Sequence, residues 1–121
     1  LIVLDAFSSD SIPIHLLTQE AIKMYVRKLD SSGFLAFHIS NRYLDLQPVL
    51  EGETNATGKL ARLIDNDEDD SQDVFSATWV LITSPASGFD AEEISRSADI
   101  ASPRKVRLWT DDYSNLFQIL K

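Results

Sequence analysis

Four consecutive apolar residues, Leu1–Leu4, open the chain and lead directly into Asp5. An uninterrupted apolar run of this kind is typical of a strand buried on both faces of a parallel sheet. Open α/β sheets bind ligands beyond the carboxyl ends of their strands, where the polar residues 5–10 are expected to lie. Because the chain begins inside this strand, we expect it to be a fragment of a larger protein or a chain that lacks its first half.

A helical pattern separates this strand from a second one. Thr18 is a plausible helix N-cap and Glu20 suits the first turn, so the apolar spacing that follows predicts an amphipathic helix at about 19–29. After a turn, Phe34–Ile39 is predicted to be a second buried strand. A strand–helix–strand unit of this length predicts two parallel strands joined by a right-handed crossover.

The remaining sequence alternates expected regular elements with polar loops, and it shows neither an internal repeat nor a long linker. The regular elements are expected at 43–50 (a short helix starting near Asp45), 59–64 and 76–83 (strands), 90–99 (a helix) and 106–109 (an extended piece). Residues 52–58 are predicted to form a polar turn, and 65–73 a charged loop. Two strands joined by such a loop favour an antiparallel pair, so a single domain with a mixed sheet is expected.

Composition narrows the possible functions. The 121 residues include no cysteine, which excludes disulfides and thiolate metal sites. The net charge of −8 argues against a nucleic-acid surface and is compatible with a cationic ligand such as a polyamine. No apolar run approaches the roughly 20 residues of a membrane helix.

No metal site is expected. The two histidines, His15 and His38, lack the paired spacing of a catalytic zinc site. The acidic run at 65–73 has Asp70 where a calcium loop needs glycine and Ser76 where it needs glutamate, so a solvated loop is the better interpretation. His38 itself is expected to be a packed, hydrogen-bonded strand residue rather than a ligand.

Asp5 is the first candidate for chemistry. A carboxylate at a strand end can orient an amine, accept its proton or bind a ribose hydroxyl, or it can simply cap backbone N–H groups of the loop. Asp10 has the same two interpretations in the same crevice. Ser8 and Ser9 can bind a ligand, but no Gly-x-Ser-x-Gly pattern surrounds them, which argues against a hydrolase nucleophile there.

Three segments resemble the spermidine synthase-like proteins, most closely the bacterial variety often fused behind a membrane-spanning region. These segments are LIVLDAFSSDSIP with the following HLLT (1–18), GFLAFHISN (33–41) and WTDDYSNL (109–116). The resemblance covers most of the chain and is least distinctive at 51–103. It implies the carboxyl-terminal half of a Rossmann-like, S-adenosylmethionine-dependent methyltransferase fold. The half that holds the adenosyl cofactor is absent from this sequence.

The resemblance also implies a site. Asp5 matches the carboxylate that serves as base or orienter for the attacking amine. The family usually has a second aspartate three residues later, where this chain has Ser8, and the next aspartate is Asp10. The residues expected to bind the amine substrate are Asp10, Ser8, Ser9, Asn41, Asp112 and Tyr113.

The implied function is transfer of an aminopropyl group from decarboxylated S-adenosylmethionine to a polyamine. The alternatives are a methyltransferase-fold enzyme acting on another substrate, and a non-catalytic module that binds a small cation or a partner. The isolated chain is expected to be inactive and to bind neither S-adenosylmethionine nor its decarboxylated form. It is expected to self-associate through an exposed apolar strand edge, and to be cytoplasmic or the cytoplasmic domain of a membrane-tethered protein.

Overall fold

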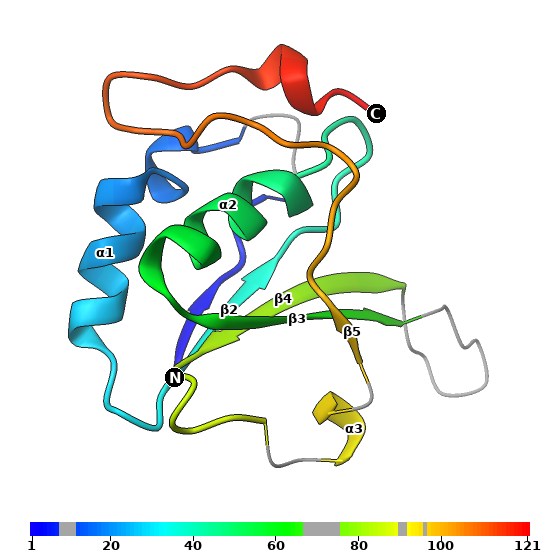
Figure 1. Ribbon diagram of the computed structural model, residues 1–121. Coiled ribbons are helices and arrows are strands. Elements are labelled where there is room, and N and C mark those ends of the chain that lie inside the picture. Colours follow the sequence, from blue (N-terminus) through cyan, green and yellow to red (C-terminus); the bar gives the residue numbers. More distant parts are fainter. Residues whose placement is uncertain (8–11, 67–75, 90–91, 96) are drawn as a thin grey trace.

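The computed structural model describes residues 1–7, 12–66, 76–89, 92–95 and 97–121, which form a mixed α/β structure (Figure 1). Its sheet has the order β1-β2-β4-β3-β5. Four strands have three to seven residues, and the fifth has two: β1 (Ile2–Leu4), β2 (Phe34–His38), β3 (Leu60–Asn66), β4 (Ala77–Thr83) and β5 (Ala98–Asp99). The helices are α1 (Gln19–Lys28), α2 (Gln47–Thr57) and α3 (Glu92–Ser95), with 3-10 turns η1 (Ile14–Leu16) and η2 (Leu116–Ile119).

The predicted strand–helix–strand unit is confirmed. β1 and β2 are parallel neighbours, with Leu4 opposite Phe37, and η1 and α1 lie between them in the sequence. α1 begins where the sequence predicts, because the Thr18 hydroxyl accepts the Ala21 N–H at 3.3 Å and so caps the helix.

The prediction that β1 is buried on both faces is wrong. β1 forms an edge of the sheet, and Val3 is 51% exposed while Leu4 is buried. Successive residues of a strand point to opposite faces, so the face carrying Val3 lacks the cover that α1 and α2 give the other. The apolar run therefore predicts the strand correctly, but it does not predict that one face of the strand is exposed.

β4 and β5 run opposite to the other three strands of the sheet, and β4 lies between two of those three. β4 pairs antiparallel with β2 on one side and with β3 on the other, so the predicted antiparallel extension is confirmed. β3 continues to Asn66, which places Asp65 and Asn66 in the strand rather than in the predicted charged loop. The rest of that acidic run, 67–73, lies outside the described residues.

The predicted turn at 52–58 is wrong, because α2 runs from Gln47 to Thr57. The helix starts later than expected, with Pro48 in its first turn, and it ends where Gly58 adopts φ 65°. Its inner side buries polar as well as apolar side chains, and this contact with the rest of the protein keeps a polar segment helical.

The predicted helix at 90–99 is confirmed only in part, because its last two residues form β5. The described helical part is the short α3, and β5 then pairs with Arg62 and Leu63 on β3. From β5 the chain passes α2 and reaches the end of the molecule that carries η2, near the start of α1 (Figure 1). Residues 106–109 lie in this segment without forming a strand, and the Trp109 side chain is fully buried.

The core lies between the sheet and the two longer helices. Its largest fully buried side chains are Trp109, Phe7, Phe37, Leu17, Ile22 and Leu35. α2 packs against β3, β4 and α1 (Figure 1). In the described part of the chain, no helix has the length and apolar character needed to cross a membrane.

Candidate functional site

Asp5 follows directly after β1, at the carboxyl end of the parallel pair. The register that sets Leu4 beside Phe37 brings the next residues, Asp5 and His38, beside each other. The Asp5 Oδ1 and His38 Nδ1 atoms are 2.7 Å apart. The sequence thus placed Asp5 correctly at a strand end, and the structure adds a histidine partner.

Two further side chains, Ser40 and Trp79, contact the His38 ring. Its Nε2 lies 2.9 Å from the Ser40 hydroxyl, which in turn accepts the backbone N–H of Thr78 at 2.8 Å. The Trp79 ring stacks on the imidazole with 4.7 Å between centroids and 18° between planes. β4 therefore fixes the orientation of His38, and His38 fixes that of Asp5.

The Asp5 carboxylate determines which His38 ring nitrogen donates a hydrogen bond and which accepts one. A carboxylate only accepts, so Nδ1 of His38 carries a proton and donates it to Asp5. In the neutral imidazole Nε2 is then an acceptor, and the Ser40 hydroxyl donates to it. The Asp5 side chain is 58% exposed and that of His38 19%, so solutes can reach the carboxylate while the imidazole is largely enclosed.

Asn41 lies in the same region, but its side chain is buried and hydrogen-bonded to neighbouring backbone groups. Its Nδ2 donates to the Phe7 carbonyl at 2.7 Å, and its Oδ1 accepts the N–H groups of Tyr43 and Leu44 at 2.9 Å each. These bonds join the loop after β1 to the loop after β2. Asn41 therefore positions the backbone next to Asp5.

The other predicted binding residues belong to different segments. Asp112 is exposed, and Tyr113 forms an isolated backbone bridge with Thr110 while Arg107 lies 4.2 Å above its ring. Ser8, Ser9 and Asp10 lie outside the described residues. Of the predicted set, the structure brings Asp5 and Asn41 to one strand end and places Asp112 and Tyr113 on the carboxyl-terminal segment.

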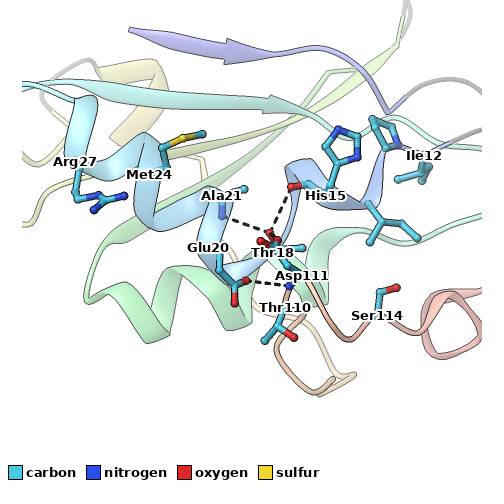
Figure 2. A pocket seen from close by; sticks show the side chains of 12 residues that line it. Ile12, His15, Thr18, Glu20, Ala21, Met24, Arg27, Thr110, Asp111 and Ser114 are labelled. Carbon is cyan, nitrogen blue, oxygen red and sulfur yellow. Dashed lines mark hydrogen bonds between the residues drawn. The ribbon is translucent and has the colours of Figure 1, made fainter.

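A groove of about 740 Å³ lies between α1, η1 and residues 110–114 (Figure 2). Its polar groups mostly bind each other: the Thr18 hydroxyl donates to Asp111 at 2.7 Å, and the Asp111 N–H donates to Glu20 at 3.1 Å. Figure 2 shows these contacts at the centre of the groove, below His15 and away from Arg27. They fasten the carboxyl-terminal segment to the start of α1.

Sequence reasoning missed three side chains. His38 and Ser40 were not linked to Asp5, although aligned ends of adjacent parallel strands could have revealed the pair. Glu53 was assigned to a turn, yet its side chain is fully buried on α2. Burial raises its pKa to about 7, and the nearby Trp109 backbone amide offsets only part of that rise. Within the described residues, no group of three or more histidine or carboxylate side chains is arranged to hold a metal ion.

Comparison with known proteins gives no assignment: no family model matches the chain, and neither a curated protein nor a solved structure matches it.

Proposed function

We propose that the chain is the amine-binding half of a spermidine synthase-like transferase, with Asp5 as the residue that receives the amine. The observation that carries the proposal is the exposed Asp5 carboxylate at the carboxyl end of β1, held by His38 at 2.7 Å. This is the strand end at which open α/β sheets bind ligands. The resemblance of 1–18, 33–41 and 109–116 to the family supplies the substrate class.

The chemistry requires a base. An ammonium group has no lone pair, so it cannot attack carbon until it loses a proton. The Asp5 carboxylate attracts the cationic amine. Its fixed orientation favours removal of the amine proton while the nitrogen points toward the carbon that it attacks. His38 supports Asp5 as the base because it holds the Asp5 Oδ1 atom in one direction while the Asp5 side chain stays exposed to solvent.

The position of β1 supports the finer fold assignment. In a doubly wound sheet of order 3-2-1-4-5-6, the fourth strand lies between the first and the fifth. A chain that supplies the fourth strand onward would leave that strand at an edge, beside the fifth. β1 lies at an edge of the sheet, parallel to β2, with Val3 exposed.

The aminopropyl donor is assigned to residues outside this chain. The segment between Asp5 and α1 contains no glycine, and η1 occupies part of it, so it offers no glycine-rich turn for the donor. Decarboxylated S-adenosylmethionine is therefore expected to bind this chain poorly. Micromolar binding of decarboxylated S-adenosylmethionine to this chain in a calorimetric titration would contradict the proposal that the donor binds elsewhere.

The decisive experiment joins the chain to a cofactor-binding half and measures aminopropyl transfer to putrescine and spermidine. Asp5→Asn should keep the fold and lower turnover by ~10²–10⁴-fold, because asparagine cannot accept the proton. Asp30→Asn, at an exposed aspartate of a turn, is the matched control and should be neutral. Asp10→Asn should weaken amine affinity more than turnover. Near-normal turnover for Asp5→Asn would rule out Asp5 as the base, and no transfer by the joined protein would favour a non-catalytic binding module instead.

A further inference from the structure

The side chains of Asp5, His38 and Ser40 form a continuous hydrogen-bonded array. Its two links are Asp5 Oδ1 to His38 Nδ1 at 2.7 Å and His38 Nε2 to Ser40 Oγ at 2.9 Å. A carboxylate, an imidazole and a hydroxyl in this order are the groups of a serine nucleophile with its general base. We propose that Ser40 is an activated nucleophile that accepts the acyl group of a small ester.

The proton positions agree with this assignment. Asp5 keeps the Nδ1–H tautomer of His38, so Nε2 is free to take the Ser40 proton. The N–H of Thr78 donates to Ser40 Oγ at 2.8 Å and stabilises negative charge on that oxygen as its proton leaves. The stacked Trp79 ring restricts rotation of the imidazole, which keeps both links in place.

Ser40 also has access to a cavity. The hydroxyl lies at the opposite edge of the imidazole from Asp5, and Ser40 lines a cavity of about 390 Å³. That volume falls within the range of small-molecule sites. Arg42 and Lys121 line the same cavity, and the Lys121 ammonium donates to the Asn41 carbonyl at 2.6 Å. The Asp65 carboxylate also lines this cavity, so among the described lining residues two cations face one carboxylate, and the excess positive charge favours the oxyanion that forms when the hydroxyl adds to a carbonyl.

The reaction balances without a further reagent. Ser40 Oγ bonds to the carbonyl carbon as its proton passes to His38 Nε2. The bond from carbon to the leaving alkoxy oxygen then breaks, and that oxygen takes the proton from Nε2. Water repeats the sequence on the acyl-serine and releases the acid. This activity differs from amine transfer and does not depend on it, because Asp5 here orients His38 and binds no amine.

The test uses the chain itself with a fluorophosphonate probe, followed by mass spectrometry of the adduct. Ser40 Oγ would bond to phosphorus, fluoride would leave, and the serine proton would pass to His38. The expected adduct lies on Ser40, and hydrolysis of p-nitrophenyl acetate should depend on the same residue. Ser40→Ala should abolish both signals, while Ser32→Ala, at an exposed serine, should change neither.

Two variants keep the nucleophile and test its activation. His38→Gln and Asp5→Asn retain Ser40 and its bond from Thr78, so they remain informative where Ser40→Ala fails to fold. The labelling rate should fall by about 100-fold in His38→Gln and by about tenfold or more in Asp5→Asn, with unchanged circular dichroism. No adduct on Ser40, or a folded His38→Gln variant that labels at the original rate, would overturn the proposal.

Discussion

Glu51 and Glu53 lie two residues apart on α2, and both are buried, but within the described residues Glu51 has an ion pair and a well-formed hydrogen bond that Glu53 lacks. Glu51 Oε2 accepts the Ser102 N–H at 2.9 Å, and Oε1 pairs with the Lys105 ammonium. The Glu53 oxygens make no hydrogen bond of good geometry in the described part of the chain. The two carboxyl groups therefore affect stability in opposite directions as the pH changes.

Glu53 should make the protein less stable as the pH rises. Burial raises its pKa from 4.5 to about 7, so the folded protein keeps a proton that the unfolded chain releases. The stabilising effect is complete below pH 4.5 and is lost between there and about pH 7. That difference is of the order of 3 kcal/mol of unfolding free energy. Chemical denaturation of the protein from pH 4.5 to 8 measures it.

Glu53→Gln should remove most of this slope and stabilise the protein at pH 8, because a neutral amide replaces the buried charge. Glu92→Gln, at an exposed carboxylate on α3, removes one charge without changing a buried group and should leave the slope intact. Equal slopes in the protein and in Glu53→Gln would show that Glu53 is not the group responsible.

Glu51 should have the reverse effect. Burial alone would raise its pKa, but the hydrogen bond from Lys105, the Ser102 N–H and the Lys105 charge lower it overall. A lowered pKa stabilises the fold above pH 4.5, and that stability is lost as the pH falls further. Glu51→Gln should cost about 2 kcal/mol at pH 7 and less at pH 3.5, as measured by denaturation. An equal loss at both pH values would contradict the ionic role of Glu51.

The central strands and α1 could be predicted because their apolar patterns and the Thr18 cap agree with their tertiary contacts. α2 could not be predicted over its full length, since the sequence of residues 52–58 predicts a polar turn. Its buried face contains Glu51, Glu53 and Thr54, and only the contacts with the sheet, α1 and the carboxyl-terminal segment make those positions interior. Gly58 was predicted correctly as a turn residue, but it ends a helix.

Position 58, at the end of α2, should require glycine for full stability. Its φ of 65° lies in the left-handed region, and space for a Cβ atom is open there. Gly58→Ala should therefore destabilise the protein by about 1 kcal/mol through backbone strain alone. Gly58→Asn should cost less, because asparagine tolerates this conformation better. Thermal unfolding of both variants measures the difference. An alanine variant as stable as the unmodified protein would contradict the left-handed conformation of Gly58 at the end of α2.

The sequence correctly predicted the position of Asp5 at a strand end, but it did not predict the side chains that contact Asp5. The run Leu1–Leu4 fixed Asp5 at a strand end, but a single strand says nothing about the side chain beside it. The parallel register brings His38 there, and Ser40 reaches the ring because it lies two residues beyond His38 and is bound by Thr78. These contacts depend on β4, which is separated from β2 by about forty residues of sequence.

Asn41 should matter first for stability. The amide joins the Phe7 carbonyl to the N–H groups of Tyr43 and Leu44, and its removal leaves buried backbone groups without these partners. Asn41→Ala should cost about 2–3 kcal/mol of unfolding free energy, and Asn41→Asp should retain the two N–H contacts but lose the bond to Phe7. Asn55→Ala, at an exposed position of α2, is the matched control and should stay within about 0.5 kcal/mol of the protein. If Asn41→Ala unfolds like the protein and instead loses amine binding in the joined transferase, Asn41 contacts substrate and its loop bonds contribute little.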